Sequence, residues 1–203
     1  LAFDTNLTLL CKAYKRIQKE FPQSGFVEQN PNELVSVSIE VLKQVVEEQH
    51  ISTSKIVSVG ITNQRETTIL WDASTSEPVY KAIVWEDNLT EEECKSLQKY
   101  ESEVREKTGL RINPYFSATK IAWILKNIPE ASKLQEKGLL RFGTVDSWIL
   151  WNLSEGKRHN TDYTNASRTL LYNINTFRWD ESLLDLFGVP KNIIPYVYPS
   201  LSS

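Results

Sequence analysis

The stretch KIVSVGITNQRETTILWD, residues 55–72, carries the pattern that decides the fold class of this chain. Residues 55–61 are rich in β-branched side chains and predict a strand, and residues 68–71 predict a second strand. The polar run Thr62–Thr68 between them places Arg65 beside Glu66 where the first strand is expected to end. Predicted strands and helices alternate on both sides of this unit, so the sequence indicates an α/β domain with a mixed sheet flanked by helices.

The residues before this stretch predict a hairpin and a long helix. Residues 1–3 and 7–11 are apolar segments on either side of the turn cluster Asp4-Thr5-Asn6, which is typical of a hairpin. Asn30 is a good N-cap and Pro31 suits the first helical position. Apolar residues at three-to-four spacing then predict a helix that extends to about Gln49.

The residues after it predict further alternation. In chain order the expected elements are a turn at 72–78, a strand at 79–85, a helix at 90–107 ended by Gly109, a helix capped by Ser117, a short strand at 141–144, a helix at 146–153 and a helix at 181–187 stopped by Gly188 and Pro190. Trp148 and Trp151 lie three apart on one helix face, which is more typical of a core than of ligand contacts.

The composition excludes several classes of partner. Charges of both signs are interspersed and the net charge is -3, so a nucleic acid is not an expected partner. There is no apolar stretch of about 18 residues and the first residues lack a signal-peptide layout, so we expect no membrane association and a cytoplasmic location. Cys11 and Cys94 are far apart without metal-ligand spacing, which favours two free thiols.

The pair Arg65 and Glu66 suits a small polyhydroxylated ligand. A guanidinium only donates hydrogen bonds and an ionised carboxylate only accepts them, so together they complement hydroxyl groups that do both. A surface ion pair is the simpler alternative, but the position beyond a strand end favours a ligand site. Trp85 could offer a ring face to the C–H surface of a polyol, and Tyr115 a hydroxyl contact. For both, packing in or at the edge of the core is about equally compatible with the pattern.

Other chemistry-bearing residues carry less weight. His159 and Asp162 lie three apart, but two residues do not make a metal site, and we favour a hydrogen-bonding loop. No glycine-rich phosphate loop occurs among the seven glycines. From these residues alone we predict no metal site, no nucleotide-phosphate cradle and no catalytic residue in this chain.

Six ordered blocks cover nearly the whole chain. They are GFVEQNP (25–31), VGITNQRETTILWD (59–72), PVYKAIVW (78–85), KTGLRINPYFSATK (107–120), FGTVDSWILW (142–151) and TDYTNASRTLLYNI (161–174). Together they resemble the glycerol kinases of the FGGY carbohydrate kinase family, and the ITNQRETT block resembles that branch rather than the xylulose or gluconate kinases. The resemblance implies an actin-like, ribonuclease-H-like ATPase fold, incomplete at both ends. Residues 1–203 would be most of the N-terminal, substrate-binding domain.

The resemblance also implies an activity and assigns roles. The full-length protein would be an ATP:glycerol phosphotransferase that uses ATP and Mg²⁺ to make glycerol 3-phosphate. Arg65 and Glu66 would bind the terminal hydroxyls of glycerol, Tyr115 would add a hydroxyl contact and Trp85 would pack on the carbon backbone. The Asp-x-Gly-Thr strand would precede residue 1. The general-base aspartate and the ATP-binding domain would follow Ser203, so this chain alone is expected to be inactive.

One departure and two alternatives accompany this interpretation. After Trp85 the chain continues Glu86-Asp87-Asn88-Leu89, which lacks the arginine usual in the family and adds negative charge near the site. A non-catalytic polyol-binding fragment and a kinase of another sugar or polyol are the alternative functions. The sequence leaves open whether the protein forms a homo-oligomer.

Overall fold

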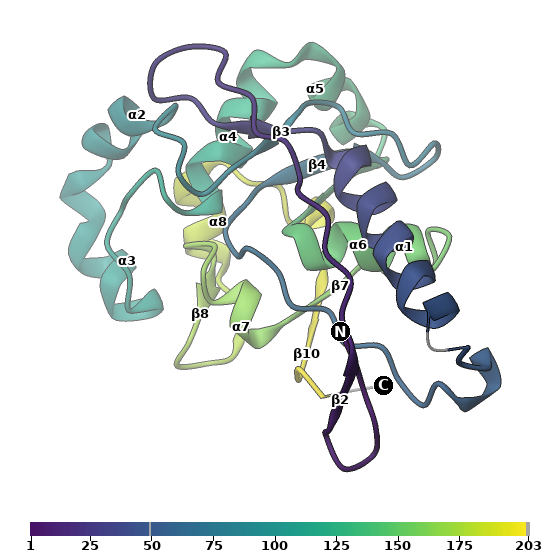
Figure 1. Ribbon diagram of the computed structural model, residues 1–203. Helices are drawn as coiled ribbons and strands as arrows, with labels where there is room; N and C mark the ends of the chain where they lie inside the picture. The colour runs from purple at the N-terminus through teal and green to yellow at the C-terminus, as the bar shows by residue number, and fades with distance from the viewer. Residues whose placement is uncertain (49, 202–203) are drawn as a thin grey trace.

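The fold is a mixed α/β arrangement in which paired strands lie between helices (Figure 1). It comes from a computed structural model that describes residues 1–48 and 50–201. The helices are α1 (Pro31–Glu48), α2 (Glu91–Ser96), α3 (Glu101–Thr108), α4 (Ser117–Asn127), α5 (Pro129–Glu136), α6 (Val145–Leu153), α7 (Tyr163–Ala166) and α8 (Glu181–Phe187), with 3₁₀ turns η1 (Thr53–Lys55), η2 (Gln98–Tyr100) and η3 (Lys191–Ile193). No described helix is long and apolar enough to cross a membrane.

The strands of the described residues associate in pairs. The antiparallel pairs are β1 (Ala2–Phe3) with β2 (Leu9–Cys11), β3 (Glu28–Gln29) with β5 (Ala82–Ile83), β4 (Ile69–Asp72) with β6 (Leu140–Gly143), and β8 (Tyr172–Asn173) with β9 (Arg178–Trp179). The parallel pair is β7 (Asn160–Asp162) with β10 (Tyr196–Tyr198). The predicted hairpin and α/β class are confirmed, although the sheet consists of short pairs.

The β4–β6 pair separates two apolar clusters. Leu70 belongs to the cluster formed largely by α4, α5 and α8, whereas Ile69 and Trp71 belong to the cluster formed with α1 and α6. This division follows from the two-residue period of a strand, which points successive side chains to opposite faces. Trp148 and Trp151 pack against Trp71, with ring centroids at 5.2 and 5.7 Å, so their predicted core role is confirmed.

The strand predicted at residues 55–61 is wrong. The turn η1 ends at Lys55, and residues 56–61 form no helix or strand and pair with none of the described strands. Val57 is 89% exposed and Val59 is 59% exposed. A β-branched composition favours a strand only where a neighbour supplies hydrogen bonds and a packing surface, and this segment has neither here.

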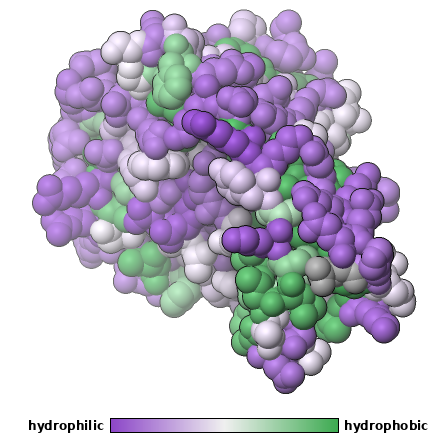
Figure 2. Space-filling model, in the orientation of Figure 1, coloured by the Kyte–Doolittle hydropathy of each residue, from purple (hydrophilic) through white to green (hydrophobic). Residues whose placement is uncertain are grey.

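Apolar side chains are also exposed on the β1–β2 hairpin. Leu7 is 82% exposed, and hydrophobic side chains gather on the lower part of the molecule, where the hairpin lies (Figure 2).

Two other elements differ from the expected ones. The helix at 90–107 is broken into α2, η2 and α3, although Gly109 ends it in the left-handed conformation as predicted. The strand at 79–85 is reduced to β5. Helix α1 is described to Glu48, and its predicted end at Gln49 lies outside the described residues.

Candidate functional site

The polar run Thr62–Thr68 lies at the start of β4 and not at the end of a strand. Thr68 exchanges two backbone hydrogen bonds with Ile83, at 2.9 and 3.0 Å, and this antiparallel bridge extends the contact between β4 and β5. Because the two segments run in opposite directions, the beginning of β4 lies beside the end of β5. Glu66 and Trp85 are therefore neighbours, by a different route from the one predicted.

Glu66 is held in a buried position. Its backbone φ is 66°, in the left-handed region, and its side chain is 4% exposed. Arg168 Nε donates to Glu66 Oε1 at 2.6 Å. Glu66 Oε2 accepts no hydrogen bond from the part of the chain that the structure describes. A buried carboxylate needs a cationic partner, and this pair leaves one oxygen for a further donor.

Trp85 and Tyr115 form an aromatic pair beside this ion pair. Their ring centroids are 5.3 Å apart with an interplanar angle of 54°. The Arg168 guanidinium lies over the Tyr115 ring at 5.7 Å and over Phe116 at 5.0 Å, so it links the carboxylate of Glu66 to the aromatic residues. Tyr115 and Arg168 also line an open cavity of about 420 Å³. The structure thus brings together three of the four predicted residues.

Arg65 is not part of this cluster. Its side chain is exposed and makes no hydrogen bond or ion pair with the described residues. The simple pair of adjacent Arg65 and Glu66 is replaced by a pair between Glu66 and Arg168, 102 positions away. The role of Arg65 in ligand binding stays a prediction.

Two residues of helix α4 form hydrogen bonds with the backbone of this cluster. Ser117 was expected to cap this helix, but it is the first helical residue and its Oγ donates to Glu66 O at 3.1 Å. Lys120 is fully buried, and its Nζ donates to Val84 O at 2.6 Å and to Tyr115 O at 3.5 Å. Burial lowers the pKa of Lys120 to about 8, although Asp87 and Glu66 act to raise it. The sequence pattern placed neither Lys120 nor Arg168 in the site.

The segment Glu86–Leu89, where the family arginine is missing, has a structural role. Asp87 is buried and accepts from Val27 N at 2.6 Å and Leu89 N at 2.7 Å. Burial raises the pKa of Asp87, while those two bonds and Lys120 lower it. Glu86 forms a salt bridge with Lys19 at 2.6 Å, so its charge is paired on the surface.

The first half of the polar run joins a separate network. Asn63 Nδ2 donates to Asn165 Oδ1 at 3.1 Å and to Asp146 Oδ1 at 3.4 Å. Asp146 also accepts from Thr161 at 2.7 Å, and burial raises the pKa of this carboxyl. This network ties the run to α6 and α7.

His159 and Asp162 are structural residues. Asp162 caps α7 by accepting from Asn165 N at 2.8 Å, and it accepts further bonds from Thr164 and Ser200. The His159 ring packs edge-on against Trp71, and its Nε2 bonds Phe142 O at 2.8 Å. The predicted hydrogen bonding is confirmed, but the predicted loop is wrong, because residues 160–162 form β7 and residues 163–166 form α7.

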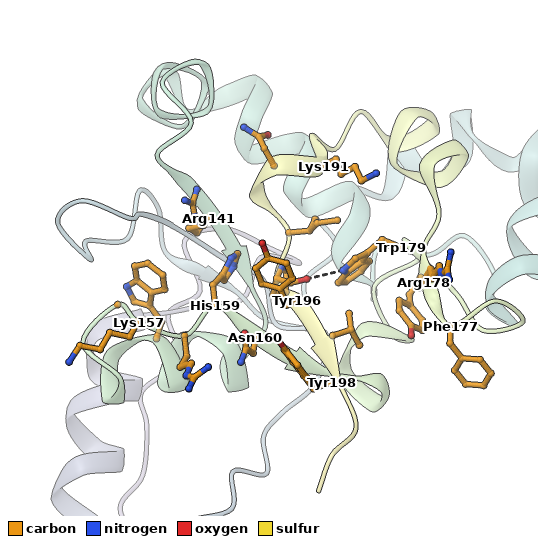
Figure 3. A pocket seen from close by; sticks show the side chains of 18 residues that line it. Arg141, Lys157, His159, Asn160, Phe177, Arg178, Trp179, Lys191, Tyr196 and Tyr198 are labelled. Carbon is orange, nitrogen blue, oxygen red and sulfur yellow. Dashed lines mark hydrogen bonds between the residues drawn. The ribbon is translucent and has the colours of Figure 1, made fainter. Parts of the chain in front are cut away.

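A cavity of about 800 Å³ lies away from the predicted glycerol-contacting residues. It is an open groove along β10 that is lined by basic and aromatic side chains (Figure 3). Lys157 and Lys191 on its rim form salt bridges with Glu155 and Glu181, and Arg141 Nη1 donates to two backbone carbonyls. These basic groups are largely used within the chain, so we do not assign a ligand to the groove.

The described residues offer no evident site for the ATP and Mg²⁺ that the resemblance implies. Among the described residues, no group of three or more His, Cys, Asp or Glu side chains could hold a metal ion. Cys11 and Cys94 are free thiols, as predicted.

The fold places the chain among the actin-like, ribonuclease-H-like sugar kinases. The crystal structure of Plasmodium falciparum glycerol kinase with ADP superposes with a TM-score of 0.88 at 33% identity, over 96% of this chain and 39% of that one. A xylulose kinase from Lactobacillus acidophilus gives a TM-score of 0.83 at 22% identity, over 97% of this chain and 38% of that one, which supports the fold alone.

Sequence comparison defines the family. Residues 1–202 match the N-terminal domain of the FGGY family of carbohydrate kinases, and the chain belongs to this family. It is 48% identical to the glycerol kinase of Mycoplasmoides gallisepticum, over 100% of this chain and 42% of the relative. It is also 48% identical to the glycerol kinase of Bacillus subtilis, over 98% of this chain and 41% of the relative. The chain therefore spans well under half the length of these relatives.

Proposed function

We propose that this chain is the glycerol-binding part of a cytoplasmic glycerol kinase, which transfers a phosphoryl group from ATP to a terminal hydroxyl of glycerol. The observation that carries the proposal is 48% identity, along 98% or more of the chain, to proteins named glycerol kinase. Residues 1–203 would be most of the N-terminal domain, and the ATP- and Mg²⁺-binding lobe and the general base would be supplied elsewhere in the full-length protein.

The geometry supports a polyol as the ligand. The free oxygen of Glu66 accepts a hydrogen bond from a hydroxyl group, and exposed Arg65 donates to hydroxyl oxygens. Trp85 and Tyr115 supply ring faces beside the carboxylate, where the C–H surface of glycerol packs. Phosphoryl transfer depends mainly on positioning and charge stabilisation, so the contribution of this chain is to fix the accepting hydroxyl.

The substrate assignment is tested on the full-length protein. ADP release is measured with glycerol, xylulose and gluconate as alternative acceptors, and we expect a clear preference for glycerol. A preference for either sugar compound would replace glycerol with another family substrate. A full-length protein that binds glycerol without releasing ADP would instead support the non-catalytic binding module.

The residue assignment is tested with Arg65→Ala. Loss of a hydrogen bond from a charged group costs about 1.5–3 kcal/mol, so glycerol affinity should fall roughly ten- to a hundredfold. Arg105→Ala on α3 is the matched control, because that side chain is also exposed and makes no hydrogen bond or ion pair with the described residues. Equal glycerol affinity in both variants would remove Arg65 from the site.

A further inference from the structure

The first turn of helix α4 forms hydrogen bonds with the residues of the predicted polyol site and with the residue before Trp85. Ser117 Oγ holds the backbone of Glu66, and Lys120 Nζ holds the carbonyls of Val84 and Tyr115. Val84 is the residue immediately before Trp85. One ammonium group therefore connects the two chain segments that carry the aromatic pair.

A buried lysine carries a free-energy cost that a purely structural position does not require. Lys120 is 0% exposed, and an ammonium group in the interior is unfavourable unless charges and hydrogen bonds compensate for the lost water. An apolar side chain of similar length would fill the same volume without this cost. The carbonyls that Lys120 binds belong to two segments far apart in the sequence, one directly after β5 and the other in the loop before α4. Val84 also bonds Val27 and Asp87 through its backbone, so Lys120 joins a segment that is already held to the Tyr115 loop.

Several charged or titratable groups face this ammonium. Asp87, Glu66 and Cys94 each act to raise the pKa of Lys120, while burial lowers it to about 8. Asp87 in turn holds Val27 and Leu89, so the turn that follows Trp85 is anchored to the same charge cluster. The ammonium is charged at neutral pH, and it loses its proton under moderately alkaline conditions in which ordinary lysines keep theirs.

We propose that Lys120 is a positioning residue of the glycerol site, whose buried ammonium sets the spacing between Trp85 and Tyr115. The inference rests on the proposed function. Lys120 acts on the ligand through the two aromatic residues, and without its charge the end of β5 and the loop at Tyr115 lose their shared anchor.

The test uses the full-length protein and compares Lys120→Met with the wild type. We expect the Kd and KM for glycerol to rise at least about tenfold, since two charge-assisted hydrogen bonds are lost, while the KM for ATP stays within about twofold. Lys120→Arg keeps the charge and should recover part of the glycerol affinity. A Lys120→Met Kd within twofold of the wild-type value would overturn the proposal.

Thr119→Ala is the matched control for a purely structural effect. Thr119 is buried on the same helix, but its hydroxyl bonds Thr90 at 2.7 Å and does not contact the aromatic pair. We expect this variant to lower thermal stability and leave glycerol affinity unchanged. A loss of affinity equal to that of Lys120→Met would mean that α4 acts only through the stability of the domain, and would overturn the proposal.

A pH titration of the wild type keeps the inference testable if Lys120→Met does not fold. Glycerol affinity should weaken as the pH rises through about 8, where Lys120 loses its charge. A flat profile up to pH 10 would contradict the role of the ammonium. The two proposals fail separately: a wild-type protein that does not bind glycerol defeats both, whereas a wild type that binds glycerol and a Lys120→Met variant that binds it equally well defeat only this one.

Discussion

The burial of His159 predicts that the protein loses stability in mild acid. The imidazole lies between two tryptophans, with ring centroids 5.4 Å from Trp71 and 6.0 Å from Trp151, in nearly perpendicular contacts. Nε2 donates to the Phe142 carbonyl at 2.8 Å. Burial lowers the pKa of His159 to about 4; the bond to Phe142 opposes this shift and Arg141 adds to it. The neutral ring is therefore the form that the folded protein accommodates.

The sign and size of the effect follow from proton linkage. The unfolded chain protonates this ring below about pH 6.5, but the folded chain does so only near pH 4. Between these values the unfolded state binds more protons, so the free energy of unfolding decreases as the pH falls. The full difference corresponds to roughly 3 kcal/mol, and about 2 kcal/mol of it is already lost at pH 5.

The assay is urea unfolding of the full-length protein at pH 7 and pH 5, followed by tryptophan fluorescence. His159→Gln lacks the titrating group, so the change in its free energy of unfolding between the two pH values should be smaller than that of the wild type by about 2 kcal/mol. Comparing the change within each variant removes the constant cost of the lost ring packing. His50→Gln is the control, because His50 is the other histidine and is exposed. If wild type and His159→Gln lost equal stability, the linkage would be refuted.

Two further substitutions test the packing around β6 and the capping of α8. Gly143→Ala should destabilise the domain by about 1–3 kcal/mol, because a Cβ there would lie 2.5 Å from Ser147 Cβ and 2.9 Å from the Trp71 ring; Gly60→Ala, which meets nothing within 4 Å, should leave the melting temperature unchanged. A melting temperature equally unaffected by both changes would show that the core adapts. Asp180→Ala removes the cap that accepts hydrogen bonds from two backbone N–H groups of α8. The free energy of unfolding, measured in urea, should fall by about 1 kcal/mol. An unchanged value would contradict the capping role.

Local patterns were enough to predict the elements whose information lies within a few residues. The start of α1 at Asn30 and Pro31, the glycine end of α3 at Gly109 and the glycine end of α8 at Gly188 were all predictable, because each depends on a residue and its immediate backbone. The strand at residues 55–61 was not, because strand formation depends on a neighbour that composition does not reveal. The same limit explains why the sequence located the polar run correctly and its position relative to a strand wrongly.

The candidate site likewise contains residues that the sequence predicted and residues that it missed. Trp85 and Tyr115 were predicted as independent candidates, and the structure places their rings together. Arg168 was missed because its partner Glu66 is 102 positions away, and no local spacing relates them. Lys120 was missed because a lysine among apolar helix residues looks like a solvated position. Its burial depends on the tertiary position of α4, from which Lys120 Nζ reaches the carbonyl of Val84.

The pairing of Glu66 with Arg168 changes how the opening motif should be understood. If Arg65 neutralised Glu66, the two charges would satisfy each other and have less to offer a ligand. Because Arg168 supplies the internal counter-charge at 2.6 Å, Arg65 remains exposed and Glu66 Oε2 accepts no bond from the residues that the structure describes. A donor and an acceptor are thus both left for hydroxyl groups. Under the proposed function, the clamp formed by two adjacent residues depends on a third residue, distant in sequence, that leaves both of them available to a polyol.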